Sequence, residues 1–209
     1  MDRQYQELPI RELGPGTGFR SPRQPQPARV TLESPALEVM TDLLRVSPAT
    51  IRPQAPLEGA NQFMISRGVR LLLVVDVQDV VLGVLTATDV LGEKALRVAA
   101  ERGIRRNELT AGDLMTPAEA VEVIALSDVQ GARVGHVLET LRRAGRQHAL
   151  VVEEEGPGPE GAPAGHAPRR ELVRGIFSVS QLARQLGLLL PQAGEVARTF
   201  AEIEAALGR

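Results

Sequence analysis

The sequence contains no cysteine, almost no lysine and few aromatic residues. Without cysteine, the chain cannot form a disulfide framework, a zinc–thiolate site or a thiol nucleophile. Aromatic residues make up 2% of the 209 residues, which argues against stacking platforms for single-stranded nucleic acid. Lys94 is the one lysine among 24 basic residues, and the formal net charge is -2. Because so little positive charge remains for phosphate neutralisation, we expect no nucleic-acid partner.

Long apolar runs and a secretory signal are also missing. Apolar runs such as Leu71–Val75 and 188–190 are far too short to cross a bilayer. The N-terminus lacks a basic start followed by an apolar stretch, which is the pattern of a signal peptide. The sequence therefore predicts a cytoplasmic protein with no membrane partner.

Catalytic and metal-binding patterns are absent from the sequence as well. Its three histidines, His136, His148 and His166, are isolated and have no cysteine beside them, so the sequence predicts no metal site. There is no Ser/His/Asp set on recognisable elements and no glycine-rich phosphate loop with a lysine, which are the usual marks of hydrolases and nucleotide-hydrolysing enzymes. We therefore do not expect an enzyme.

The chain does contain one short sequence motif that occurs twice. Residues 83–89 read GVLTATD, and residues 175–181 read GIFSVSQ. Each copy begins with glycine, continues with two apolar residues and places hydroxyls at its fourth and sixth positions. Two hydroxyls and a carboxylate at the end of an apolar strand can hold a phosphate and a ribose diol. A packed core needs no such set.

Other landmarks repeat in the same order, which indicates two copies of one unit. The opening 39–41, VMT, matches 114–116, LMT, and the strand 73–76, LVVD, matches 150–153, LVVE. The spacing then grows by 15 residues in the second copy, because 154–170 is an insertion rich in Gly, Pro and Ala. The entropic cost of closing a loop grows only slowly with its length, so the fold can tolerate an enlarged hairpin loop. The insertion is either passive or a partner-binding loop.

These landmarks predict four segments. Residues 1–30 form a flexible arm rich in Pro, Gly and Arg. Residues 34–110 form the first repeat, and residues 111–188 the second, with its insertion at 154–170. Residues 191–207 form an amphipathic helix, because Val196, Phe200, Ile203 and Leu207 are spaced four, three and four apart.

Apolar periodicity predicts the elements of each repeat. In the first we expect a helix at 57–67, strands at 71–75 and 80–85, and a helix from about 88. The corresponding elements of the second are a helical stripe at 134–141, strands at 149–153 and 172–177, and a helix at 180–186. The predicted fold class is α+β, with tandem β-α-β-β-α repeats. The two sheets should pack against each other around a pseudo-twofold axis, since neither unit can cover its sheet alone.

Over residues 34–188 the chain resembles a CBS-domain pair, also called a Bateman module. The resemblance rests on the paired openings, the apolar strand at 71–75, the motif at 83–89, its weaker copy and the repeat itself. It implies an adenosine-containing ligand (AMP, ADP, ATP or S-adenosylmethionine) in a cleft between the repeats.

The resemblance also assigns residues to this ligand. Thr86 and Thr88 would approach the phosphate, and Asp89 would accept from the ribose hydroxyls. In the second copy Ser178 and Ser180 match, whereas Gln181 departs from the pattern. Arg70 and His148 stand where such modules often carry a basic residue facing phosphate; an exposed or strand-edge role is the alternative for both.

The chemistry of the seventh motif position predicts unequal clefts. A carboxylate can accept from both hydroxyls of a cis-diol, whereas glutamine offers one acceptor oxygen. We therefore expect one competent cleft at Asp89 and a weaker or empty one at Gln181. The alternative for Asp89 and Thr88 is helix capping, a role compatible with ligand binding because a helix N-terminus attracts phosphate.

The sequence thus predicts a stand-alone regulatory module that senses an adenine nucleotide. No cofactor is required, and no residues remain for a catalytic domain. Such a module would act through an unidentified protein partner, beginning with a homodimer. The alternative function is a constitutive dimerisation or scaffold protein whose nucleotide cleft has degenerated.

Overall fold

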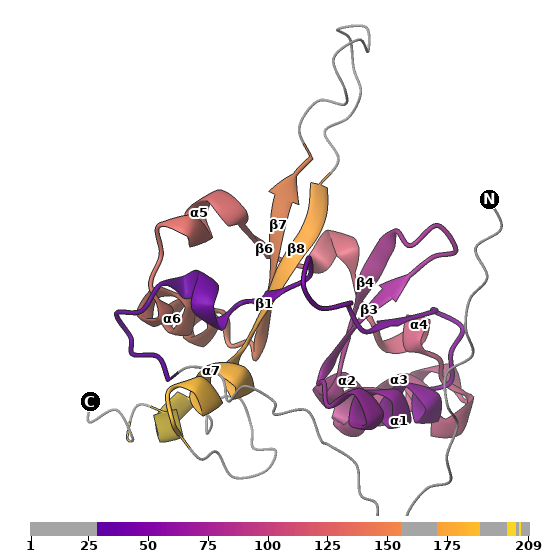
Figure 1. Ribbon diagram of the computed structural model, residues 1–209. Helices are drawn as coiled ribbons and strands as arrows, with labels where there is room; N and C mark the ends of the chain where they lie inside the picture. The colour runs from indigo at the N-terminus through magenta and orange to yellow at the C-terminus, as the bar shows by residue number, and fades with distance from the viewer. Residues whose placement is uncertain (1–28, 156–170, 189–199, 204, 206–209) are drawn as a thin grey trace, which may run out of the picture.

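The computed structural model describes residues 29–155, 171–188, 200–203 and 205. The predictions for the arm at 1–28, for the insertion at 156–170, and for Val196 and Leu207 of the tail lie outside these residues. Within them, Figure 1 shows two α/β halves side by side, with the strands toward the middle and the helices outside.

Each half is built on a four-stranded sheet. The first sheet has the order β2-β3-β4-β5 and the second the order β1-β8-β7-β6. The strands of the first sheet are β2 (Thr50–Ile51), β3 (Leu71–Val75), β4 (Val81–Thr86) and β5 (Thr116–Pro117). Those of the second are β1 (Thr41–Asp42), β6 (Val123–Ala125), β7 (His148–Glu154) and β8 (Glu171–Ser178). This arrangement confirms the predicted α+β fold of tandem repeats.

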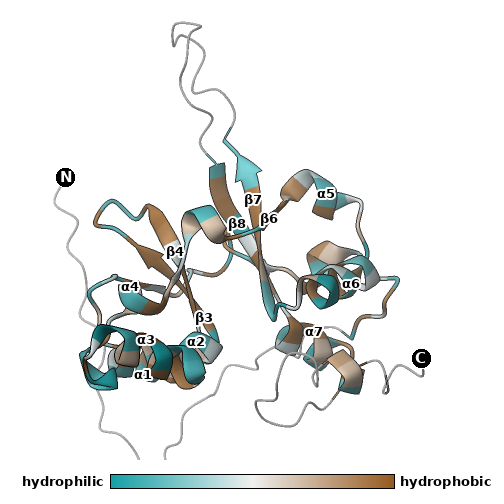
Figure 2. Ribbon diagram, turned by 180° about the vertical axis from the view of Figure 1, so that it is seen from behind, coloured by the Kyte–Doolittle hydropathy of each residue, from teal (hydrophilic) through white to brown (hydrophobic). Residues whose placement is uncertain are grey.

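Helices cover the outer side of each sheet. The first half carries α1 (Leu57–Arg67), α2 (Ala87–Leu91), α3 (Glu93–Arg102) and α4 (Ala111–Leu114), and the second carries α5 (Leu126–Gln130), α6 (Val134–Ala144) and α7 (Val179–Gln185). Short 3-10 helices lie at Ala36–Val39, Arg106–Glu108 and Ala118–Ala120. In Figure 2, hydrophilic colours mark much of α2, α3 and α4, while β3 and β4 are largely hydrophobic. In the described part of the chain, no helix has the length and hydrophobicity of a membrane span.

The openings of the two repeats are exchanged between the halves. β1, from the first repeat, pairs with β8 of the second sheet. β5, from the second repeat, pairs with β4 of the first sheet. The 3-10 helix Ala36–Val39 also contributes Ala36 and Val39 to the core of the second half. Repeats that are consecutive in the sequence are therefore interlocked in space.

The first glycine of each motif makes this exchange possible. A Cβ on Gly83 would lie 2.3 Å from the carbonyl oxygen of Thr116, in the incoming opening. A Cβ on Gly175 would lie 2.4 Å from the sulfur of Met40. A side chain at position 83 would clash with the backbone of β5 and push it off the sheet, whereas a side chain at position 175 would displace the Met40 side chain. Close approach of this kind is a physical reason for glycine in a strand interior.

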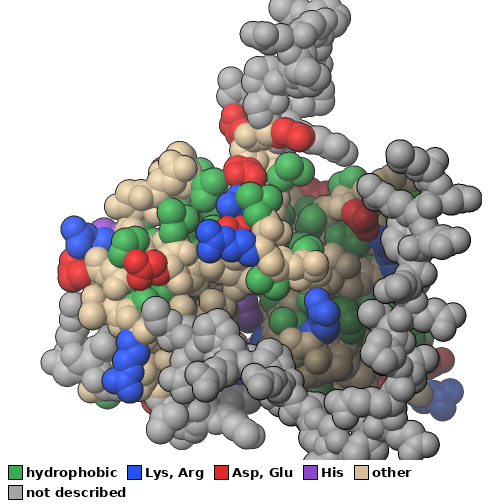
Figure 3. Space-filling model, in the orientation of Figure 1, with side chains coloured by type: hydrophobic (Ala, Val, Ile, Leu, Met, Phe, Trp, Pro, Cys, Tyr) green, Lys and Arg blue, Asp and Glu red, His purple; other side chains and the backbone are tan. Residues whose placement is uncertain are grey.

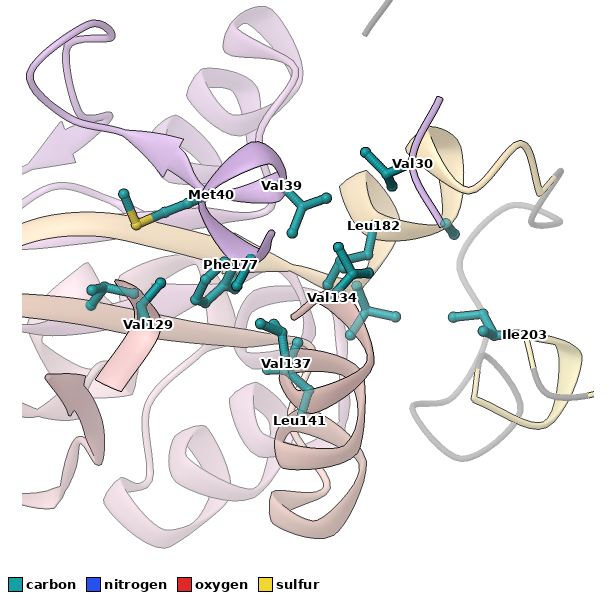
Figure 4. Packing of buried hydrophobic residues seen from close by; sticks show 14 of the residues in the cluster. Val30, Val39, Met40, Val129, Val134, Val137, Leu141, Phe177, Leu182 and Ile203 are labelled. Atoms are coloured by element: carbon teal, nitrogen blue, oxygen red, sulfur yellow. The ribbon is translucent and has the colours of Figure 1, made fainter. Parts of the chain in front are cut away.

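Three apolar clusters hold the fold together. One lies between the first sheet and its helices, with Leu72, Leu85 and Leu114 fully buried. A second fills the corresponding place in the other half, where Figure 4 shows residues of the opening, of β8 and of α6 pointing toward one another. Phe200 and Ile203 of the tail are buried in this second cluster.

The third cluster joins the two sheets. It is made of Leu71, Leu73, Val75 and Val84 from the first half and Leu150 from the second. All five residues of β3 are buried, because one face of the strand meets its own helices and the other meets the opposite sheet. This is the predicted sheet-to-sheet packing, and it leaves clefts where the sheets diverge.

Candidate functional site

A cleft of about 280 Å³ lies between the two halves at the end of β4. Its first wall contains Thr86, Thr88 and Asp89 from the motif at 83–89. Its second wall is the segment 145–150, which leads into β7. The structure therefore brings Thr86, Thr88 and Asp89 together at a crevice between the halves.

Thr86 and Asp89 are bound to each other at the start of α2. The Asp89 Oδ2 atom accepts from the Thr86 backbone N at 2.9 Å and from Thr86 Oγ1 at 2.6 Å. In return, the backbone N of Asp89 donates to Thr86 Oγ1 at 3.2 Å. This is a capping box, in which two orphan backbone donors of the helix are satisfied reciprocally. The capping role that the sequence left open for Asp89 is therefore real.

The other oxygen of Asp89 is bound by a lysine that sequence reasoning did not assign. Lys94, on α3, donates from Nζ to Asp89 Oδ1 at 2.7 Å and also to the carbonyl oxygen of Leu114. The side chains of Lys94 and Asp89 are 31% and 15% exposed. No sequence signal relates Lys94 to the cleft, because its placement depends on the break between α2 and α3 at Gly92.

Thr88 is the residue of the motif whose side chain is exposed. It is exposed and lines the cleft, and within the described residues its hydroxyl makes no hydrogen bond. The hydroxyl is thus free to donate a hydrogen bond to a ligand oxygen or to accept one from a ligand donor.

The opposite wall carries the cation of this cleft. Arg146 lines the cleft, and its Nη2 lies 3.2 Å from Oε2 of Glu122, which is itself 78% exposed. An ion pair this exposed contributes little, so the guanidinium can turn toward an anion at small cost. Arg146 is not among the residues predicted from the sequence, although it lies just before β7, where a basic residue facing phosphate is expected.

His148 also lines the cleft, at the start of β7. Burial lowers the pKa of its imidazole from 6.5 to about 4, and the positive charge of Arg70 acts in the same direction. The imidazole is therefore neutral at pH 7. In this state it can donate one hydrogen bond and accept another, but it adds no charge.

Arg70 is not among the residues that line this cleft. Its carbonyl oxygen accepts from the backbone N of Ala87, and the carbonyl oxygen of Gln147 accepts from Val179 in the same way. These matching bonds make Gln147 the counterpart of Arg70. Arg70 therefore lies in the first repeat at the place that corresponds to the 145–150 wall of this cleft.

The polar side chains of the second motif form hydrogen bonds within the protein. Gln181 Oε1 accepts from Thr41 Oγ1 at 2.8 Å, and the hydroxyls of Ser178 and Ser180 lie 2.9 Å apart, within hydrogen-bond distance. Thr41 comes from the exchanged opening of the first repeat, 140 residues away in the chain. The only acceptor oxygen on the Gln181 side chain is thus already in use.

A larger hollow of about 830 Å³ lies at the hairpin ends of the two sheets. Its lining is mainly aliphatic and includes Val80, Val123 and Leu172, each more than 40% exposed. Figure 3 shows hydrophobic side chains reaching the surface between the halves. Val84 of the first motif lines this hollow, but the hydroxyl, Asp and Gln positions of the two motifs do not. Among the described residues, no group of three His, Asp or Glu side chains is placed to bind a metal ion.

Comparisons with known proteins agree with this architecture. The family model of the CBS domain matches residues 36–96. A search of the curated proteins finds no match. Among solved structures, an uncharacterized conserved protein from Pyrococcus horikoshii is similar at 18% identity and a TM-score of 0.51, covering 78% of this chain and 100% of that chain.

Two further solved structures are CBS-domain pairs. One is the pair of protein MJ0100 in complex with 5′-methylthioadenosine and S-adenosyl-L-methionine, at 19% identity and a TM-score of 0.48, covering 74% of this chain and 97% of that one. The other is CBSX2 from Arabidopsis thaliana in complex with AMP, at 17% identity and a TM-score of 0.46, covering 72% and 94%. The chain thus carries a CBS domain at residues 36–96, and its two interlocked halves have the same fold.

Proposed function

We propose that this protein is a regulatory module that senses an adenosine-containing ligand through the cleft at Asp89. AMP, ADP, ATP and S-adenosylmethionine are the candidate ligands. The module would report ligand occupancy to a protein partner, or through a homodimer, without catalysing a reaction itself.

One observation carries the proposal: the cleft gathers complementary groups from both halves. Thr88 and Asp89 come from the first half, and Arg146 and His148 from the second. A ligand touching both walls would stabilise one relative packing of the sheets by its differential affinity for that packing. The geometry thus couples binding to the arrangement of the whole molecule.

The two motif copies are proposed to differ in strength. Asp89 keeps a carboxylate at the cleft wall, whereas the Gln181 oxygen is held by Thr41. A ribose hydroxyl donating to a carboxylate makes a charge-assisted hydrogen bond, worth about 1.5–3 kcal/mol. Neutral Gln181 offers a weaker acceptor, and Thr41 already uses one of the two lone pairs of its oxygen.

Calorimetric titration with the four ligands, on the wild type and on matched variants, tests the proposal. Asp89→Asn keeps the side-chain size and one oxygen for the helix cap, so it removes the charge with the least damage to α2. It should weaken binding roughly tenfold or more. Gln181→Ala is the matched control at the other motif and should leave this affinity nearly unchanged. The reverse order of effects would place the stronger cleft at the second motif and contradict the proposal.

Thermal unfolding separates the proposed function from its alternative. A saturating ligand at 100 times its dissociation constant adds about 2.7 kcal/mol to the free energy of unfolding. No stabilisation by any of the four ligands would instead favour a constitutive dimerisation or scaffold protein with a degenerate cleft. The internal partners of Asp89 and Gln181 are the observations that favour this alternative.

A further inference from the structure

The carboxylate of Asp89 has nearly exhausted its capacity to accept hydrogen bonds. A carboxylate offers about four lone-pair sites. Three donors occupy them here: the backbone N of Thr86, Thr86 Oγ1 and Lys94 Nζ. A ribose diol donates two hydrogen bonds, so it needs one site more than Asp89 has free. One existing donor must therefore leave before both hydroxyls can bind.

Lys94 is the donor that can leave. The bond from the Thr86 backbone N belongs to the capping box of α2, and breaking it would expose an orphan backbone group of the helix. The Thr86 hydroxyl is held beside Asp89 because it also accepts from the Asp89 backbone N. The Lys94 side chain is 31% exposed, so water can solvate its ammonium group once it is released. The long flexible stem of lysine also moves easily, because it has no rigid fork to preserve.

We propose that Lys94 is an internal competitor for the ribose site, and that it sets how strongly the cleft prefers a diol. This inference rests on the proposed function. In the empty cleft Lys94 neutralises Asp89 and holds it in place. When a ribonucleoside enters, its diol replaces the ammonium group at Oδ1. Ligand affinity is thus lowered by the cost of breaking the Lys94–Asp89 pair.

Release of Lys94 has a second structural consequence. The same ammonium donates to the carbonyl oxygen of Leu114, which lies in α4, just before β5. Displacement therefore frees an acceptor in the exchanged segment that joins the second repeat to the first sheet. Occupation of the cleft is linked in this way to the interlock between the halves.

The second motif copy uses different chemistry at the corresponding place. There the exchanged opening reaches the seventh motif residue directly, through Thr41 Oγ1 and Gln181 Oε1. In the first copy the connection between Asp89 and the exchanged segment runs through Lys94, which is the chain's only lysine. A mobile ammonium can be exchanged for a ligand's donors, so the first copy alone has a displaceable link.

The test compares AMP with 2′-deoxy-AMP, which lacks one hydroxyl of the diol. Dissociation constants are measured by calorimetry for the wild type and for Lys94→Met, which keeps an apolar stem and removes the donor. AMP should bind the variant roughly tenfold more tightly than it binds the wild type, equivalent to about 1.4 kcal/mol. Binding of 2′-deoxy-AMP should change far less, because one free acceptor already suffices for its single hydroxyl. The loss of a positive charge affects both nucleotides equally and cancels in their ratio.

Two control variants isolate the role of Lys94. Arg97→Met removes a cation from the same helix, where Arg97 makes only a 3.8 Å ion pair with Glu101, and should leave the ratio of the two affinities at the wild-type value. Lys94→Arg retains a charged donor for Asp89 and should keep the ratio close to that value too. Thermal unfolding of each variant establishes that it folds.

The outcomes separate this inference from the proposed function. If AMP binds the wild type but Lys94→Met leaves the ratio unchanged or lowers it, Lys94 is no competitor while the nucleotide cleft stands. If AMP binds Lys94→Met but not the wild type, the result supports both the nucleotide cleft and the role of Lys94 as a competitor. If no variant binds either nucleotide at a concentration that saturates the protein, the AMP-binding cleft fails and the role of Lys94 fails with it.

Discussion

At the scale of single residues, His148 gives the protein a measurable response to pH. Its pKa is lowered to about 4 in the folded protein by burial, and by the charge of Arg70, from a normal value of 6.5. Between pH 4 and pH 6.5, His148 is protonated in the unfolded chain but neutral in the folded protein. The free energy of unfolding therefore falls as the pH drops from 6.5 to 4, by roughly 2 to 3 kcal/mol.

Replacing His148 with leucine tests this response. Leucine is the residue that its counterpart Leu71 carries in the first repeat, so the substitution suits a strand buried between sheets. His148→Leu should flatten urea unfolding midpoints between pH 6.5 and 4, where wild-type midpoints decline. Asp42 and Asp113 also have lowered pKa values, but their stabilisation is lost only below about pH 4. An equal decline in the variant would assign the response to other groups.

At the scale of elements, β1 is held by side chains because it is only two residues long. Arg174 on β8 pairs with both oxygens of Asp42 and lies 3.4 Å from Glu153 on β7. The arginine hydrogen bond is the largest cause that lowers the pKa of Asp42. The carboxylate therefore contributes stability above its unfolded pKa of 3.8 and loses it as the pH falls through the lowered value.

Removing Arg174 should detach β1. In Arg174→Met, two carboxylates face each other without their shared cation, so hydrogen exchange at 41–43 should accelerate and the urea midpoint should fall. Arg45→Met is the matched control, because Arg45 is 84% exposed and lies 3.5 Å from the same Asp42. It should change little. Equal effects of the two variants would show that the bidentate pair does not hold the strand.

At the scale of the whole molecule, the exchanged openings make each half depend on the other. Leu114 is fully buried in the core of the first half, although it belongs to the second repeat. A fragment of residues 1–110 therefore lacks part of its own core, whereas residues 1–120 retain both α4 and β5. Removing one repeat from the other should disrupt the sheet of the remaining half.

Circular dichroism of the two fragments tests this interdependence. Fragment 1–120 should show a cooperative thermal transition that fragment 1–110 lacks. Adding fragment 111–209 to fragment 1–110 should restore the transition, because it supplies the missing opening. Cooperative unfolding of fragment 1–110 alone, at the temperature of fragment 1–120, would contradict the dependence on the exchanged opening.

The sequence by itself determined the positions of the main elements and the identity of the cleft motif. The predicted helix at 57–67 and the strand at 71–75 coincide with α1 and β3, because periodicity and burial are written locally in the chain. The repeat itself indicated two packed halves. Thr86, Thr88 and Asp89 lie together because they are close in the sequence, at the point where a strand is followed directly by a helix.

Only the tertiary structure decided what these residues touch. The contact of Thr41 with Gln181, the position of Lys94 on Asp89, and Arg146 in the opposite wall all depend on which opening lies on which sheet. Two repeats with matching elements have the same apolar pattern whether their openings are exchanged or kept. The choice is made by long-range packing, through the space above Gly83 and Gly175, and no local pattern in the sequence records it.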